Sequence, residues 1–196
     1  MKKTFALISI LVLCIQVSAQ ETEKTYKNVV SFNPIYFTAS TFMMGYERFI
    51  KPNKSLTFYL GAIYDQNYKE GFTAEFQYRY FISDQDIWQK DNLKIFFAPY
   101  LQYKNVEMMG RWWVDNNGVV EDHNYTIHAY GAGIMFGFKL TVIDRLVFDA
   151  YVGGGIRRTN DYKEDGKENF YYEDGVTDAG YNGIAPKAGV TVGFNF

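Results

Sequence analysis

Charged side chains recur on one face of several predicted strands, and these residues have the clearest capacity for chemistry. Successive side chains of a strand point to opposite faces, and here carboxylates and cations alternate with apolar neighbours. Buried charges must pair or be neutralised. The sequence therefore predicts a charge network within the lumen of a barrel, made by Glu47, Glu75, Arg79, Asp149, Arg157 and Lys187. The same alternation turns three more cations inward, namely Lys94, Lys104 and Lys139.

Two interpretations of this network remain open. It is a structural plug, which we favour, or it is a gated ion path in which pairs such as Glu47–Arg79 exchange partners. General acid or base catalysis by Glu47 or Glu75 would require a substrate cleft. A filled lumen offers none, so we expect no catalytic residue there.

A lipid-modifying hydrolase is a further alternative. Such an enzyme needs a serine, a histidine and a carboxylate near the outer rim of the barrel. Ser40 and His128 are predicted near that rim, but no local motif surrounds them. We expect His128 to be an interfacial side chain with an apolar body and a solvated edge.

The segment 159–182 is rich in acidic residues. Its two Glu-Asp-Gly triplets, 164–166 and 173–175, offer oxygen ligands of the kind calcium prefers. The spacing from Asp161 fails the EF-hand pattern, because Lys163 occupies the third position. We expect a solvated acidic loop without a metal site or cofactor. A minor alternative is that divalent cations bridge this loop to the anionic surface of lipopolysaccharide.

Trp112 and Trp113 stand together in a segment predicted to be a loop. Exposed aromatic side chains mark contact sites in many proteins, and tryptophan also anchors barrels at the membrane interface. Both interpretations of the pair stay open.

Eight segments of alternating pattern position these residues. They cover 28–37, 41–50, 55–65, 71–82, 93–105, 125–140, 145–158 and 183–196. An even number of strands places connectors 51–54, 83–92 and 141–144 on one side of a membrane, and the long connectors 106–124 and 159–182 on the other. Outer-membrane barrels have this asymmetry. We predict an all-β, eight-stranded, antiparallel up-and-down transmembrane barrel, whose side chains fill the lumen and leave no open pore.

A soluble, lipocalin-like ligand carrier is the rival fold for such a pattern. That barrel keeps its apolar face inside, whereas here the polar face is rich in glycine and the apolar face carries aromatics. Glycine suits a narrow, crowded interior, and aromatic residues, 19% of this chain, suit a lipid-facing girdle. The pattern favours the membrane.

The N-terminal residues predict export. Lys2 and Lys3 precede an apolar run that ends in a small-residue cleavage site before Gln20. We expect a cleaved signal peptide at 1–19, a periplasmic segment at 20–27 and a barrel domain at 28–196. Cys14, the only cysteine, lies in the signal peptide, so disulfides are not expected. The formal charge of −2 gives no basic footprint of the kind that nucleic acid requires, so we expect no nucleic-acid partner.

Several short motifs resemble the small exported barrels of Gram-negative outer membranes that carry a domain of unknown function, and they are broadly similar to OmpA/OmpX-like barrels. The motifs are Gly45-Tyr46-Glu47-Arg48, Tyr78-Arg79-Tyr80-Phe81, Phe97-Ala98-Pro99-Tyr100, Gly131-Ala132-Gly133 and Gly153-Gly154-Gly155. The resemblance implies a place in the cell outer membrane and no established activity. It implies contact with outer-membrane lipids, lipopolysaccharide and the insertion machinery, which recognises a terminal aromatic such as Phe196. A structural or interaction role through the outer loops follows, with a protein or surface ligand as partner.

Overall fold

The computed structural model describes six stretches of backbone, and their side chains apart from residues 68–69, 108–114, 119–125 and 161–162. The stretches are 26–64, 68–82, 93–114, 119–142, 145–162 and 181–196. The predicted signal peptide lies outside them. Within these stretches, no helix is long and apolar enough to cross a membrane.

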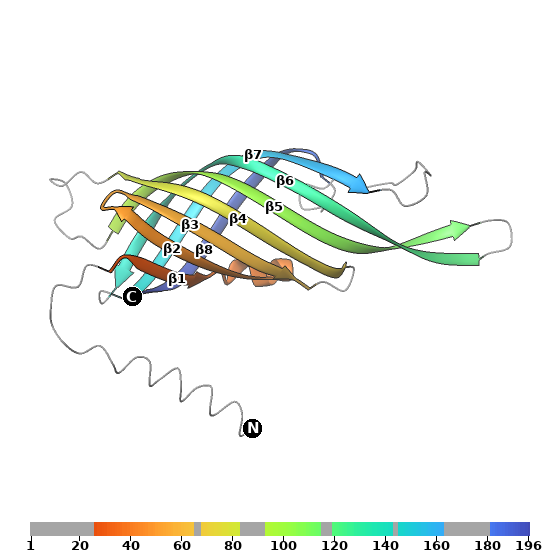
Figure 1. Cartoon of the computed structure of the whole chain (residues 1–196), viewed down its shortest axis with the longest axis horizontal. Coiled ribbons are helices and arrows are strands. Elements are labelled where there is room, and N and C mark those ends of the chain that lie inside the picture. The colour runs from red at the N-terminus through yellow and green to blue at the C-terminus, as the bar shows by residue number, and fades with distance from the viewer. Residues whose placement is uncertain (1–25, 65–67, 83–92, 115–118, 143–144, 163–180) are drawn as a thin grey trace, which may run out of the picture.

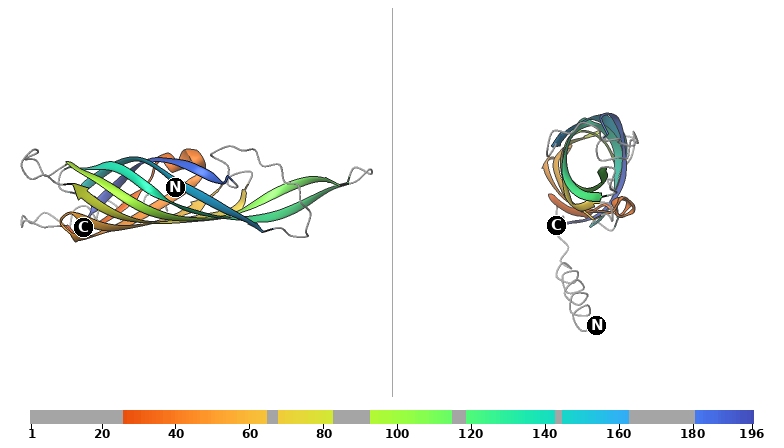
Figure 2. Two further views of the ribbon diagram at one scale, coloured as in Figure 1. Left: turned by 90° about the horizontal axis from the view of Figure 1, so that it is seen from above. Right: turned by 90° about the vertical axis from the view of Figure 1, so that its right-hand side faces the viewer.

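Eight antiparallel strands form a single closed barrel (Figures 1 and 2). Each strand pairs with the next along the chain, and the last pairs with the first. This confirms the predicted eight-stranded up-and-down fold. The strands are β1 (Asn28–Phe32), β2 (Thr41–Lys51), β3 (Lys54–Ile63), β4 (Tyr68–Ile82), β5 (Leu93–Val114), β6 (Val119–Val142), β7 (Leu146–Tyr162) and β8 (Gly183–Asn195).

The barrel closes where β1 meets β8. Val30 lies opposite Phe194 in this pair. At the end of the seam, the amide of Phe196 donates to the carbonyl oxygen of Asn28 over 2.9 Å. The described start and end of the chain therefore meet at one end of the barrel, which we call the terminal end. The opposite end, where β5 and β6 extend furthest, is called the ribbon end (Figure 1).

The first strand is shorter than the sequence predicts. It ends at Phe32, and a 3-10 helix, η1 (Ile35–Ala39), follows it at the ribbon end. Pro34 lacks the N–H that a strand ladder needs. The side chain of Asn33 stabilises the turn, because its Oδ1 accepts from the amides of Ile35 and Tyr36 over 3.1 and 3.4 Å. Tyr36 belongs to the predicted strand 28–37, but in the structure it lies in η1 and lines a cavity inside the barrel.

Replacing Asn33 with alanine is expected to lower the free energy of unfolding by about 1–3 kcal/mol, the cost of leaving buried polar groups unpaired. Asn33 is 1% exposed, and its Nδ2 also donates to the hydroxyl of Tyr151 over 3.1 Å. Urea unfolding in lipid vesicles measures the loss. Asn28→Ala, which removes exposed hydrogen bonds, is the control and is expected to cost less. Equal losses in the two variants would contradict the structural role of Asn33.

The predicted loop 106–124 is largely strand. β5 continues to Val114 and β6 begins at Val119, and their register pairs Val106 with Ile127 and Val114 with Val119. The two strands leave the barrel as a two-stranded ribbon (Figure 1). Residues 106–114 keep the extended pairing of the barrel wall, although their sequence lacks a regular alternation of apolar and polar residues. The turn signal at 116–118 lies outside the described residues.

The two faces of the sheet differ as the alternation predicts. Large apolar side chains cover the outside, with Leu101 at 62% exposed, Val152 at 64% and Ile184 at 77%. Arg79 and Gln77 are 0% exposed inside the lumen. A soluble carrier barrel has the reverse arrangement, so the structure contradicts that alternative.

Candidate functional site

Arg79 of β4 is the centre of the charge network inside the barrel. One of its terminal nitrogens lies 2.6 Å from a carboxylate oxygen of Asp149 and 3.4 Å from one of Glu47. The other donates to the hydroxyl of Tyr59 over 2.9 Å. These groups come from β2, β3, β4 and β7, so the network ties together strands on different sides of the barrel.

Lys139 of β6 completes this cluster. Its Nζ donates to Glu47 and lies 3.6 Å from Oδ1 of Asp149. The hydroxyl of Ser55 donates to the other oxygen of Glu47 over 2.5 Å. The ammonium group also sits over the ring of Phe49, 5.3 Å from its centroid. Both carboxylates are thus shared between two cations.

A second cluster surrounds Glu75, closer to the ribbon end. Lys187 and Gln77 donate to it, the latter over 2.6 Å, and Gln102 donates over 3.3 Å. Gln77 also accepts from Nε of Arg79 over 2.8 Å. Its amide therefore connects the two clusters into one network.

The network is electrically balanced. Among the described residues, the buried charged side chains are three carboxylates and three cations: Glu47, Glu75, Asp149, Arg79, Lys139 and Lys187. Each carboxylate has a cation within ion-pair distance. A neutral, mutually paired set of this kind holds the strands together across the lumen and presents no isolated acid or base for catalysis.

The structure brings together five of the six residues predicted for the network. Arg157 is the exception, because it lies nearer the ribbon end, where its Nε donates to the carbonyl oxygen of Tyr181 over 3.1 Å. Lys139 takes part instead. The β6–β7 register places Lys139 directly opposite Asp149. Knowledge of this register would have assigned Lys139 to the network.

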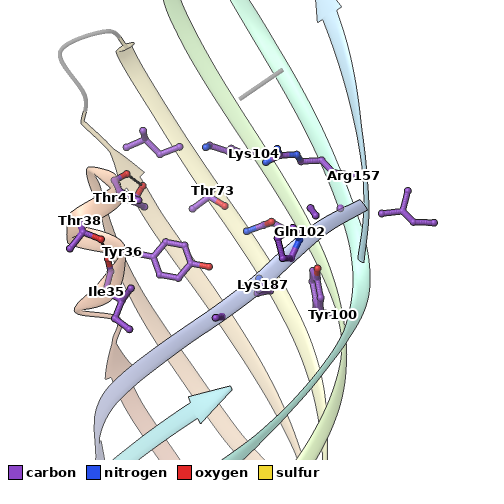
Figure 3. Close-up of a pocket in the computed structure, with 17 residues that line it drawn as sticks. Ile35, Tyr36, Thr38, Thr41, Thr73, Tyr100, Gln102, Lys104, Arg157 and Lys187 are labelled. Carbon is purple, nitrogen blue, oxygen red and sulfur yellow. Dashed lines mark hydrogen bonds between the residues drawn. The ribbon is translucent and has the colours of Figure 1, made fainter. Parts of the chain in front are cut away.

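A cavity of about 270 Å³ lies above the network, toward the ribbon end (Figure 3). We call it the cup. Its wall includes η1 and side chains of β4, β5, β7 and β8, and Lys187 of the Glu75 cluster lies in its lining. Polar or charged groups at the cup include those of Tyr36, Thr73, Tyr100, Gln102, Lys104 and Arg157.

Ser40 and His128 do not form the triad that the hydrolase alternative requires. Ser40 lies between η1 and β2, whereas His128 lies on the outer face of β6, whose neighbours are β5 and β7. The Nδ1 atom of His128 lies 2.8 Å from the hydroxyl of Tyr103 and 3.0 Å from Nδ2 of Asn105. Its described partners are thus polar groups of the neighbouring strand β5.

Comparison with known proteins places the chain in a family. The model described as "Protein of unknown function (DUF3575)" matches residues 5–173. The chain belongs to the DUF3575 family. This agrees with the resemblance to barrels that carry a domain of unknown function. The comparison with curated proteins gave no match.

Among solved structures, the DUF3575 chain is similar to the crystal structure of the N-terminal beta-barrel domain of Pseudomonas aeruginosa OprF. The two share 17% sequence identity with a TM-score of 0.45, over 88% of this chain and 98% of that chain.

Two predicted features of the DUF3575 chain lie outside what the structure describes. The side chains of Trp112 and Trp113 are among the undescribed ones, although their backbone belongs to the β5–β6 ribbon. The acidic segment 163–180 is not described at all. In the described part of the chain, no group of histidine, cysteine and carboxylate side chains is arranged to hold a metal ion.

Proposed function

We propose that this DUF3575 barrel is an outer-membrane protein whose lumen is closed by the charge network, and that it has a structural or interaction role through its ribbon end. The observation that carries the proposal is the combination of an apolar outer wall with a balanced network inside. Arg79, Gln77 and Ser55 are 0% exposed, so solvent does not reach the centre of the network.

The outer wall has a boundary that fits a membrane interface. Tyr103 and Tyr130 lie side by side on β5 and β6, and the next outward-facing pair toward the ribbon end is Asn105 and His128. A belt of tyrosines followed by polar side chains is the pattern that barrels show at the edge of the hydrocarbon layer. The β5–β6 ribbon therefore extends beyond the membrane, where it is available for contact.

Replacing Val152 with lysine tests the membrane environment of the wall. Val152 is in the middle of β7, opposite Phe136 and Ala188, and faces outward. In a bilayer the lysine is expected to lower the free energy of unfolding by about 2–4 kcal/mol. In water, an exposed valine tolerates lysine almost without cost. Urea titration of the barrel in vesicles measures the difference, with Val152→Ala as the control for lost packing. A Val152→Lys variant as stable as Val152→Ala would contradict the proposal.

A gated conductance pathway is the second candidate, because one observation favours it. Arg79 and Lys139 each lie within ion-pair distance of both Glu47 and Asp149. The pairs can therefore exchange partners without large movement of the backbone. Planar-bilayer recordings decide between the candidates: silence across pH and voltage supports the closed lumen, and discrete currents that disappear in Arg79 variants support the gate.

A further inference from the structure

We propose that the cup at the ribbon end of the lumen is a binding site for a small anion, in particular a phosphate monoester carried on a hydroxylated body such as a sugar. The proposal goes beyond a structural role for the barrel. It requires only that the barrel is folded, and it does not depend on which membrane holds it.

The charge of the cup favours an anion. Its described lining contains three cations, Lys104, Arg157 and Lys187, and no carboxylate. The charge of Lys187 is neutralised by its ion pair with Glu75. No carboxylate among the described residues pairs with Lys104. Lys104 therefore contributes a positive charge to the cup that no described carboxylate balances.

The cations Lys104 and Arg157 lie close to one another. Lys104 and Arg157 project into the cup from β5 and β7, and their charged ends lie near each other (Figure 3). They are close enough to interact electrostatically. Both side chains are half-buried, so water screens their repulsion only in part. An anion between them would convert this repulsion into two charge-assisted contacts.

Tyr100 supplies a hydrogen-bond donor to the cup. It is 6% exposed, and its hydroxyl points into the cup (Figure 3). The described residues provide no hydrogen-bond partner for this hydroxyl. It is not among the buried polar atoms that lack a partner, so it is open to the space of the cup, where water or a ligand can accept from it. Its position below Arg157 and beside Gln102 would let it donate to an anion bound between the cations.

The remaining lining defines the body of the ligand. Thr41, Thr73 and Gln102 contribute hydroxyl and amide groups, and Gly131 leaves space beside Gln102. The volume of about 270 Å³ is near the lower limit of small-molecule sites, which hold roughly 300–1,000 Å³. A guanidinium group binds phosphate oxygens through paired N–H groups. These features fit a phosphorylated monosaccharide better than an apolar ligand without charged or hydroxyl groups.

Isothermal titration of the folded full-length barrel in detergent tests the proposal. The probes are inorganic phosphate, glucose 6-phosphate, glucose and purified lipopolysaccharide. The variants are Lys104→Gln and Lys104→Glu, and the matched control is Arg158→Gln, which removes the neighbouring cation of β7 that faces outward. A heat-modifiable band on a gel verifies that each variant is folded.

We expect saturable binding of glucose 6-phosphate and no detectable binding of glucose. Binding is expected to weaken about tenfold or more in Lys104→Gln, the loss of one charge-assisted contact. It should be absent in Lys104→Glu and unchanged in Arg158→Gln. If lipopolysaccharide binds with this dependence on Lys104 and the free phosphates do not, the phosphate is lipid-borne and the site stands. No saturable binding of any phosphate probe, or equal binding by wild type and the folded Lys104→Glu variant, overturns the proposal.

Discussion

Replacing Arg79 with methionine is expected to lower the free energy of unfolding by about 3–5 kcal/mol, the usual cost of removing one partner from a buried ion pair. The guanidinium group is 0% exposed and contacts Asp149, Glu47 and Tyr59. Without it, three buried carboxylates face only two cations, Lys139 and Lys187. Urea unfolding in vesicles, followed by circular dichroism and by the heat-modifiable band, measures the loss.

The matched control restores the balance of charge. Combining Arg79→Met with Asp149→Asn removes one charge of each sign, and we expect the double variant to regain part of the lost stability. This recovery separates an electrostatic effect from a loss of packing, because methionine is present in both variants. An Arg79→Met barrel within about 1 kcal/mol of wild type would show that the network does not hold the strands together.

Replacing Gly133 with alanine is expected to cost about 3 kcal/mol or more, at or above the upper end of typical overpacking. A Cβ atom at Gly133 would lie 2.2 Å from the carbonyl oxygen of Gly154 and 2.5 Å from Cα of Gly155 on the adjacent strand. These are backbone atoms, so only a separation of β6 from β7 relieves the clash. The same vesicle titration measures the cost.

Gly131 provides the control, because it precedes Gly133 by two residues on the same face of β6. A Cβ atom there would have its closest neighbour, Cβ of Gln102, at 3.6 Å, which is an ordinary contact. Gly131→Ala is therefore expected to be near neutral. If the two alanine variants unfold at the same urea concentration, close packing of β6 on β7 does not explain the glycines of these strands.

Local patterns in the sequence predicted the wall of the barrel. The alternation of Leu101, Val152 and Ile184 with inward residues gave the correct outer face and the correct number of strands. Where strands pair, the side-chain period of two leaves little freedom about which face a residue occupies. Most residues of the lumen network could be selected for this reason.

The pairing of those inward residues could not be predicted in the same way. It depends on the register between strands, which is a property of the closed barrel and not of any one segment. Lys139 meets Asp149 because β6 and β7 place them opposite each other. Arg157 has the same inward orientation but lies opposite Gly131, eight residues further along β7 from Asp149. The cup was missed for the same reason, since its lining comes from η1 and several strands.

Two boundaries were wrong for local reasons. The sequence around Pro34 alternates like a strand, but the side chain of Asn33 accepts the amides of η1 and stops the ladder at Phe32. In contrast, residues 106–114 lack a regular alternation of apolar and polar residues, but they continue the β5–β6 pairing. Backbone hydrogen bonds between neighbouring strands outweigh the weak preferences of single residues there.

Fractionation of cells that express the full chain tests the central claim, a closed barrel in the outer membrane. The membrane fraction is run on a gel with and without boiling, and intact cells are treated with protease. We predict a heat-modifiable band in the outer membrane, with external cleavage confined to residues 106–124 and 159–182. A periplasmic band that is soluble without detergent and unchanged by boiling would contradict the claim.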